Sequence, residues 1–210
     1  MKNIKAIIFD LGGVILNINY QNTINSFKNL GIKNPNLFYS KKSQTNLFDQ
    51  IEIGEITEME FLLELQKKIP KASVRQIKSA WNAMLLDLPE KRISVLRKLI
   101  PSYSIFLLSN TNVIHISEFK KKIGSKRYEE FYNLFDKVYY SYKIKCRKPH
   151  AKAFKLILNQ NELAPNEVLF IDDSPQHIKG AKKLGIKTHH LQHNEEITTL
   201  FPDITLQVLH

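Results

Sequence analysis

The sequence predicts an α/β fold, a doubly wound parallel sheet core with a small helical cap inserted after the first strand. Short apolar runs typical of buried strands recur at residues 5–10, 104–109, 137–141, 167–172 and 187–192. Helical patterns separate the later runs, and strands joined by helical crossovers form parallel sheets covered on both faces. Between the first two runs, the chain carries helix signals and no convincing strand. We therefore expect a core from residues 1–16 and 87–210 and a cap from residues 17–86.

The expected helices of the insertion begin at recognisable capping residues. Thr57 with Glu60, and Ser73 with Gln76, match the capping-box pattern, and each pair precedes an apolar run. A block of helices between the first two strands is placed to cover the end of the sheet where α/β folds hold ligands.

The expected helices of the core follow equally local signals. Pro89 suits the first turn of a helix over residues 90–100. Further helices are expected over residues 151–159 and 176–184, and Gly185 ends the second of these. Their alternation with strands indicates crossovers of a parallel sheet.

The composition is typical of a globular protein without a membrane anchor. The chain has 210 residues, enough for one sizeable core with a small insertion. No apolar run approaches about 18 residues, so we expect no membrane span. The first expected strand begins so near residue 1 that we expect no signal peptide. Cys146 is the only cysteine, which excludes an internal disulfide and favours a reducing cytoplasm.

The chain is strongly basic, with a net charge of +11 from 31 Lys and Arg against 20 Asp and Glu. Such a balance fits nucleic acid, an acidic surface or small anionic substrates. The basic residues are scattered, however, and clusters such as residues 120–122 are typical of a solvated helix face. We therefore expect neither a nucleic acid nor a membrane as partner, and a monomer or weak homodimer.

Residues that can carry chemistry stand at four strand ends or in the loops that follow: Asp10, Ser109 and Asn110, Lys148, and the pair Asp172 and Asp173. Each alone has an ordinary explanation, such as a helix cap, a turn or a solvated lysine. Together they predict one site, where converging carboxylates favour a hard cation such as Mg²⁺. A lysine and helix N-termini would bind a phosphoryl group there. Asp10 would then be placed to attack phosphorus.

These motifs, in this order and with a helical insertion after the first, resemble the haloacid dehalogenase superfamily of hydrolases and phosphatases. The similar segments are residues 9–16 (FDLGGVIL), 108–112 (LSNTN), 147–149 (RKP) and 170–174 (FIDDS). They look like the branch with a small helical cap that includes α-D-glucose-1-phosphate phosphatase and the phosphatase half of epoxide hydrolases. The resemblance implies a Rossmann-like core and a Mg²⁺-dependent phosphatase of a small phosphorylated metabolite, above all a sugar phosphate.

The resemblance also implies roles for the matching residues. Asp10 would be the nucleophile that forms an aspartyl-phosphate, and Lys148 would hold both Asp10 and the phosphate. The residues implied to bind the phosphoryl group are Leu11, Gly12, Ser109, Asn110 and Lys148. Those implied to bind Mg²⁺ are Asp10, Gly12 through its backbone carbonyl, Asp173 directly, and Asp172 as a second or water-mediated ligand. Gly54, with Glu52 and Glu55, falls where such enzymes place a specificity loop.

Gly12 departs from the pattern, because most relatives carry there an Asp that protonates the leaving group and then activates water. Such acid–base help contributes roughly 10²–10⁴-fold to the rate. Three explanations stay open. The leaving group needs little protonation, as in an anomeric sugar phosphate, an acyl phosphate or pyrophosphate; or Asn17, His115 or His177 substitutes; or the protein is slow or inactive. Glycine is also common at this place in the glucose-1-phosphate phosphatase branch, which counts against lost activity.

Two other functions fit parts of the pattern. A 2-haloacid dehalogenase uses the same Asp nucleophile on carbon and also lacks the second Asp, but such enzymes typically lose the acidic pair that Asp172 and Asp173 retain here. A non-catalytic binding protein on this scaffold predicts erosion of the phosphate-binding residues, yet Ser109 and Lys148 are present.

The histidines near the motifs are interpreted as structural. His177 stands where relatives often carry Asp or Asn, and we expect it to support the acidic loop. Adjacent strand residues point to opposite faces, so at most two of His189, His190 and His193 could share a ligand shell.

Overall fold

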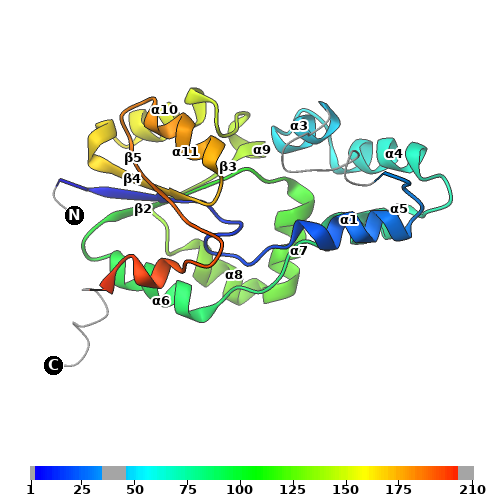
Figure 1. The fold of residues 1–210 in the computed structure, drawn as a ribbon, viewed down its shortest axis with the longest axis horizontal. Coiled ribbons are helices and arrows are strands. Elements are labelled where there is room, and N and C mark those ends of the chain that lie inside the picture. Colours follow the sequence, from blue (N-terminus) through cyan, green and yellow to red (C-terminus); the bar gives the residue numbers. More distant parts are fainter. Residues whose placement is uncertain (1–2, 35–45, 203–210) are drawn as a thin grey trace.

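The computed structural model describes residues 3–34 and 46–202, and a five-stranded parallel sheet in the order β3-β2-β1-β4-β5 lies at its centre (Figure 1). The strands are β1 (Ala6–Phe9), β2 (Ser104–Ser109), β3 (Lys137–Tyr140), β4 (Val168–Asp172) and β5 (Lys187–His190). All five expected strands are present, and the predicted α/β fold class is confirmed. The first and third strands end one residue earlier than expected and the fifth two residues earlier; the third does so because Ser141 already begins a helix.

The central strand β1 buries both of its faces. It pairs with β2 on one side, where Ala6 lies opposite Ser104, and with β4 on the other, where Ala6 lies opposite Val168. Ile7 and Phe9 belong to one buried cluster, whereas Ala6 and Ile8 belong to a second. This alternation shows why the strand reads as a continuous apolar run.

Helices cover both faces of the sheet (Figure 1). On one side lie α10 (Ala151–Gln160) and α11 (Pro175–Lys182), and on the other α6 (Glu90–Leu99), α7 (Val113–Ile123) and α8 (Ser125–Tyr132). Shorter elements are α9 (Ser141–Ile144) and the 3₁₀ turns η1 (Pro165–Glu167) and η2 (Ile197–Thr199). Pro89 has extended backbone angles (φ −68°, ψ 127°) and stands at the N-cap of α6, so the expectation that it lies inside the first turn was wrong.

The segment between β1 and β2 contributes the helices α1 (Tyr20–Asn29), α3 (Asn46–Glu52), α4 (Glu58–Lys68) and α5 (Val74–Asn82). They lie together at one end of the sheet (Figure 1). Both expected capping boxes, at Thr57 and Ser73, are formed. The assignment of residues 17–86 as a cap remains a prediction, and its residues 35–45 lie outside the described residues, as do residues 1–2 and 203–210 of the expected core.

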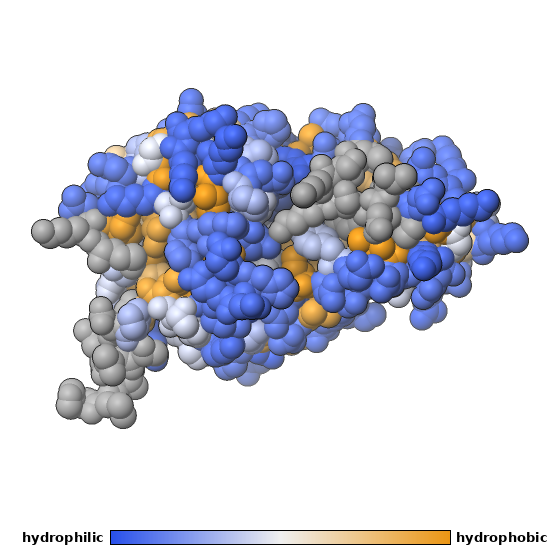
Figure 2. Space-filling view, in the orientation of Figure 1, coloured by the Kyte–Doolittle hydropathy of each residue, from blue (hydrophilic) through white to orange (hydrophobic). Residues whose placement is uncertain are grey.

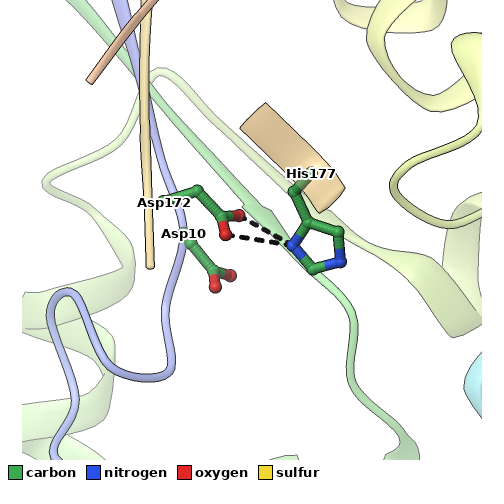
Figure 3. Close-up of side chains that lie close together, drawn as sticks. All are labelled: Asp10, Asp172 and His177. Atoms are coloured by element: carbon green, nitrogen blue, oxygen red, sulfur yellow. Dashed lines mark hydrogen bonds and ion pairs between the residues drawn. The ribbon is translucent and has the colours of Figure 1, made fainter. Parts of the chain in front are cut away.

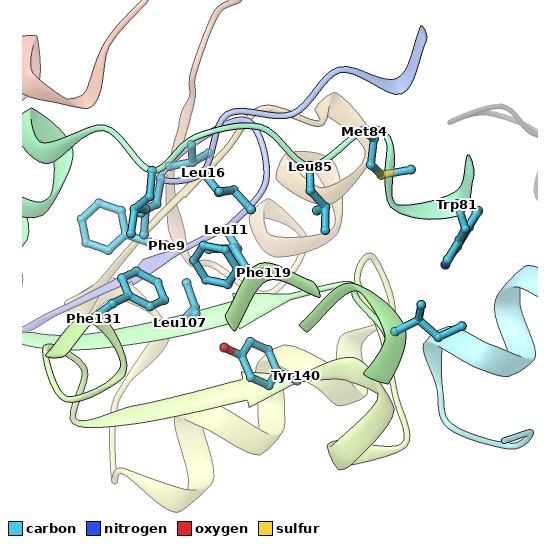
Figure 4. Packing of buried hydrophobic residues seen from close by; sticks show 14 of the residues in the cluster. Phe9, Leu11, Leu16, Trp81, Met84, Leu85, Leu107, Phe119, Phe131 and Tyr140 are labelled. Carbon is cyan, nitrogen blue, oxygen red and sulfur yellow. The ribbon is translucent and has the colours of Figure 1, made fainter. Parts of the chain in front are cut away.

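An aromatic stack joins these helices to the core. Trp81 of α5 stacks on Phe48 of α3 at 5.2 Å between ring centroids and on His115 of α7 at 4.7 Å. Figure 4 shows Trp81 beside the apolar side chains that continue into the core. Full burial of an aromatic side chain stabilises a fold by about 1.5–3 kcal/mol, so this stack is a substantial part of the attachment.

The face of the molecule drawn in Figure 2 is mostly hydrophilic. Apolar residues appear there as separate small areas. Within residues 3–34 and 46–202, no helix has the length and apolar character that crossing a bilayer would require.

Candidate active site

The strand order places the site at the topological switch point of the sheet, where the direction in which successive strands are added reverses. From β1 the chain runs outward to β2 and β3 on one side, and β4 and β5 lie on the other side. In α/β sheets such a switch point is where ligands bind, at the carboxyl ends of the strands. Asp10 directly follows β1, and Asp172 ends β4. Figure 3 shows their carboxylates next to each other, with His177 on the far side of Asp172.

Lys148 joins the two carboxylates. Its Nζ lies 2.8 Å from Asp10 Oδ1 and 2.6 Å from Asp172 Oδ2, and the side chain is fully buried. Burial alone would lower the pKa of Lys148, but Asp10 and Asp172 raise it above its usual value. The lysine is therefore a fixed positive charge between the first and fourth motifs.

The loop that carries Lys148 is held by the side chain of Asn110. Asn110 Nδ2 donates to the Lys148 carbonyl at 2.9 Å, and the Lys148 N–H donates to Asn110 Oδ1 at 2.9 Å. Sequence reasoning assigned only a phosphate-binding role to Asn110 and missed this clamp. The second motif thus positions the third.

Both oxygens of the Asp172 carboxylate accept hydrogen bonds. Ser174 N–H donates to its Oδ1 at 2.7 Å, and His177 Nδ1–H donates at 3.0 Å. Burial alone would raise the pKa of Asp172, but Lys148 and His177 hold it at about 2. Burial lowers the pKa of His177, so this ring is neutral with its proton on Nδ1. His177 supports the acidic loop, as expected.

The Asp10 carboxylate is also buried, but its interactions offset the cost of burying its charge less fully than those of Asp172 do. The Leu11 N–H donates to its Oδ1 at 2.7 Å, so this donor is directed at the carboxylate itself. Burial raises the pKa of Asp10 to about 7, Asp172 and Asp173 add to the shift, and Lys148 opposes it. The carboxylates of Asp172 and Asp173 thus concentrate negative charge beside Asp10, and such a cluster of carboxylates fits a bound cation.

Asp173 and the first glycines complete an oxygen-rich corner. A Cβ on Gly13 would lie 2.7 Å from Asp173 Oδ2, so this carboxylate passes directly over Gly13. The carbonyls of Leu11 and Leu16 accept turn hydrogen bonds, whereas within the described segments none ends on the Gly12 carbonyl. Carboxylate and carbonyl oxygens are the ligands of hard cations such as Mg²⁺. The residues of this corner therefore fit such an ion.

A second group of potential metal ligands is less suitable for binding a cation. One potential metal-ligand atom from each of Asp10, Asp172 and His177 lies within 4.8 Å of the other two. Lys148 already contacts both of these carboxylates, and His177 donates its Nδ1 proton to Asp172. The Asp10 and Asp173 side of the site is the better place for a cation.

Two candidates for the missing acid have hydrogen-bond partners outside the four motifs. Asn17 Nδ2 donates to Asp87 Oδ1 at 3.0 Å. His115 Nδ1 lies 2.9 Å from Asn82 Oδ1, and burial lowers the pKa of His115 to about 3. Among the described interactions, neither side chain contacts Asp10.

Two features beside the site were missed. Tyr20 at the start of α1 is partly buried and lines a cleft with Asp173, and desolvation of its phenol, followed by Asp173 and Asp10, raises its pKa. Arg147, the neighbour of Lys148, forms ion pairs with Asp49 and Glu52 of α3, at 3.3 Å to Glu52 Oε2. No local sequence signal indicates either, because each depends on contacts between distant segments.

Comparisons with known proteins agree with this geometry. Residues 7–191 match the haloacid dehalogenase-like hydrolase family. The chain belongs to this family. As a haloacid dehalogenase-like hydrolase, it is 30% identical over 186 residues to the D-ribitol-5-phosphate phosphatase of Bacteroides thetaiotaomicron, covering 88% of this chain and 90% of that protein.

Two solved structures of the family are similar over nearly their whole length. One is a variant of a haloacid dehalogenase family enzyme from B. thetaiotaomicron in complex with magnesium and inorganic phosphate, with a TM-score of 0.86, 35% identity, and coverage of 94% of this chain and 98% of that one. The other is a family hydrolase from Porphyromonas gingivalis, with a TM-score of 0.82, 30% identity, and coverage of 98% and 99%. The expected family resemblance is confirmed.

Proposed function

We propose that this hydrolase is a Mg²⁺-dependent phosphatase that hydrolyses a small phosphometabolite, above all a sugar phosphate, through an aspartyl-phosphate on Asp10. The observation that carries the proposal is the buried Lys148 ammonium held between Asp10 and Asp172. A strand-end carboxylate beside a fixed positive charge is equipped to approach a phosphoryl group, because the lysine offsets negative charge on both reactants. The named phosphatase relative and the magnesium and phosphate complex of a family enzyme support the same chemistry.

In the proposed reaction, a carboxylate oxygen of Asp10 attacks phosphorus while the bond from phosphorus to the substrate oxygen breaks. The released alkoxide takes a proton from water, and the hydrolysis step that follows returns one proton to water. Water then attacks the phosphorus of the aspartyl-phosphate, which releases inorganic phosphate and restores the Asp10 carboxylate. Lys148 stabilises the negative charge of both steps.

The remaining roles follow the placement of the motifs. The phosphoryl oxygens are proposed to bind Ser109, Lys148 and the backbone N–H groups of Gly12 and Asn110, and also the Leu11 N–H, which would have to leave the Asp10 carboxylate. The proposed Mg²⁺ ligands are Asp10, the Gly12 carbonyl, Asp173 and, through water, Asp172. Mg²⁺ bound there would neutralise charge on the nucleophile and the phosphoryl group. The saturated hydrogen bonding of Asp172 supports the water-mediated role for this residue.

The segment 17–86 is proposed to act as the substrate-selecting cap. Arg147 ties α3 to the loop of the catalytic lysine, and Lys145 Nζ donates to the Gly54 carbonyl in the expected specificity loop. A Cβ on Gly54 would lie 2.5 Å from the Tyr142 carbonyl, so this loop sits against the core. We further propose a cytoplasmic monomer or weak homodimer with no nucleic-acid or membrane partner.

A phosphate-release screen tests the proposal directly. Sugar phosphates including D-ribitol 5-phosphate, nucleotides, pyrophosphate and acyl phosphates are assayed with and without Mg²⁺, with Asp10→Asn as the inactive control. We expect Mg²⁺-dependent release that is highest on a sugar phosphate and lost in the variant. Halide release from 2-chloropropionate without added metal would instead identify a dehalogenase. Binding of sugar phosphates without any turnover would identify a binding protein.

A further inference from the structure

A side chain beyond the four motifs holds the backbone of Asp173. His190 ends β5, and its Cα pairs in register with Asp172 of β4. The Leu191 N–H donates to the Asp172 carbonyl at 3.0 Å, which is the last backbone hydrogen bond between these strands. The next carbonyl along, that of Asp173, accepts from His190 Nε2 at 3.1 Å. The imidazole thus continues the ladder by one bond, past the end of the strand.

The ring of His190 is itself fixed. Gln192 Nε2 donates to the His190 carbonyl at 2.9 Å and lies 3.0 Å from His190 Nδ1. A carbonyl only accepts, so this Gln192 atom is the amide nitrogen and Nδ1 must accept from it. The proton of the imidazole is therefore on Nε2, the atom that faces the Asp173 carbonyl.

Asp173 is consequently held from two sides. Its carbonyl is bound by His190, and its carboxylate passes over the bare backbone of Gly13, where a Cβ would lie 2.7 Å from Oδ2. His190 and Asp173 line the same cleft of about 630 Å³, together with Gly13 and Tyr20. Water in this cleft can replace the imidazole as a donor, but water does not constrain the peptide in the same way.

We infer that His190 is a positioning residue that sets the Mg²⁺ affinity of the site by fixing the peptide of Asp173. The inference rests on the proposed function, because it assumes that Asp173 binds the ion. Loss of a hydrogen-bond partner behind a metal ligand typically lowers metal affinity 10–100-fold. His190 acts through the backbone, so we expect about a tenfold loss when its donor is removed.

Three substitutions of His190 distinguish the effect of its hydrogen bond from the effect of the size of its ring. His190→Phe keeps a ring without the donor, and His190→Gln places an amide N–H near the position of Nε2. His190→Asn places an amide only near the position of Nδ1, too short to reach the Asp173 carbonyl. His189→Phe is the matched control, since His189 Nε2 faces Glu195 at 2.9 Å instead of the acidic pair.

The Mg²⁺ dissociation constant of each metal-free protein is measured by isothermal titration calorimetry, with the thermal midpoint as a check of folding. We expect a weakening of about tenfold in His190→Phe and His190→Asn, and affinity within about twofold of wild type in His190→Gln and His189→Phe. An unchanged dissociation constant in His190→Phe overturns the inference and leaves the proposed function intact. Equal weakening in His190→Gln shows a general packing effect and also overturns it. A wild-type protein that binds no Mg²⁺ overturns both.

Discussion

Restoring an acid at position 12 tests the most unusual feature of the site. The substitution Gly12→Asp is expected to be tolerated, because the three atoms nearest to a Cβ there all belong to Ile18, with Cδ1 at 2.9 Å at the end of a flexible side chain. Gly12 is not among the glycines with positive φ, so no backbone strain is added. Shifting Ile18 costs about 1 kcal/mol. A general acid contributes roughly 10²–10⁴-fold, or about 3–5 kcal/mol of activation free energy.

The gain should depend on the leaving group. For a phosphate ester of a primary alcohol, such as D-ribitol 5-phosphate, we expect kcat/KM of Gly12→Asp to rise by about 10²-fold or more. For p-nitrophenyl phosphate, whose leaving group needs no proton, we expect a change below about threefold. Gly12→Asn is the control, since it has the same size and no acidic proton. Both variants are compared at saturating Mg²⁺, because the new carboxylate adds negative charge beside Asp10.

Two results would refute this reasoning. An equal gain in Gly12→Asn would show that the effect is steric. No gain in Gly12→Asp, in a protein with wild-type thermal stability and Mg²⁺ affinity, would show that another group already supplies the proton.

Four further perturbations address the charge and the closure of the site. Asp10→Asn should lower kcat by about 10³-fold or more in a phosphate-release assay while leaving the fold intact, because the nucleophile is removed; near wild-type turnover would contradict the assignment. Gly13→Ala, at φ +82° and 2.7 Å from Asp173 Oδ2, should weaken Mg²⁺ binding in calorimetry, and unchanged affinity would show that Asp173 is not a ligand. Since burial raises the pKa of Asp10 to about 7, a proton competes with the cation below that pH, and the Mg²⁺ dissociation constant should fall about tenfold from pH 6 to pH 8; a flat profile would contradict it. Arg147→Met removes the ion pair with Glu52 and should lower the free energy of unfolding by about 2 kcal/mol and raise KM; adding Glu52→Gln should recover much of the stability, and no recovery would argue against the ion pair.

Most of the fold could be predicted because its signals are local. The apolar runs of the strands and the capping boxes at Thr57 and Ser73 each lie within a few neighbouring residues, and the structure contains them. The strand order could not be derived from such signals, because it depends on which strands pair in space. Pro89 shows the limit at element ends, since a proline suits both the N-cap and the first turn of α6.

In the site, too, some features follow from local sequence signals and others depend on contacts between distant segments. Asp10, Lys148 and the acidic pair stand at strand ends or in the loops that follow, so a parallel sheet brings them together at one edge. The contacts that hold these residues in place join separate segments. Asn110 clamps a residue 38 positions away, and Arg147 pairs with Asp49 across 98 positions. No motif spacing indicates such contacts, and each became visible only in the folded chain.

The two neighbouring glycines of the first motif show how differently one residue type can be constrained. Gly13 is required by the fold, because its φ of +82° and the Asp173 carboxylate at 2.7 Å both exclude a side chain. At Gly12 the backbone has no positive φ, and the atom nearest to a Cβ is Cδ1 at the end of the flexible Ile18 side chain. The fold therefore tolerates an acid at position 12 and does not explain its absence. Three chemical explanations therefore remain, a leaving group that departs without a proton, a proton source elsewhere in the site, or slow turnover, and the leaving-group dependence of Gly12→Asp tests for the second of these.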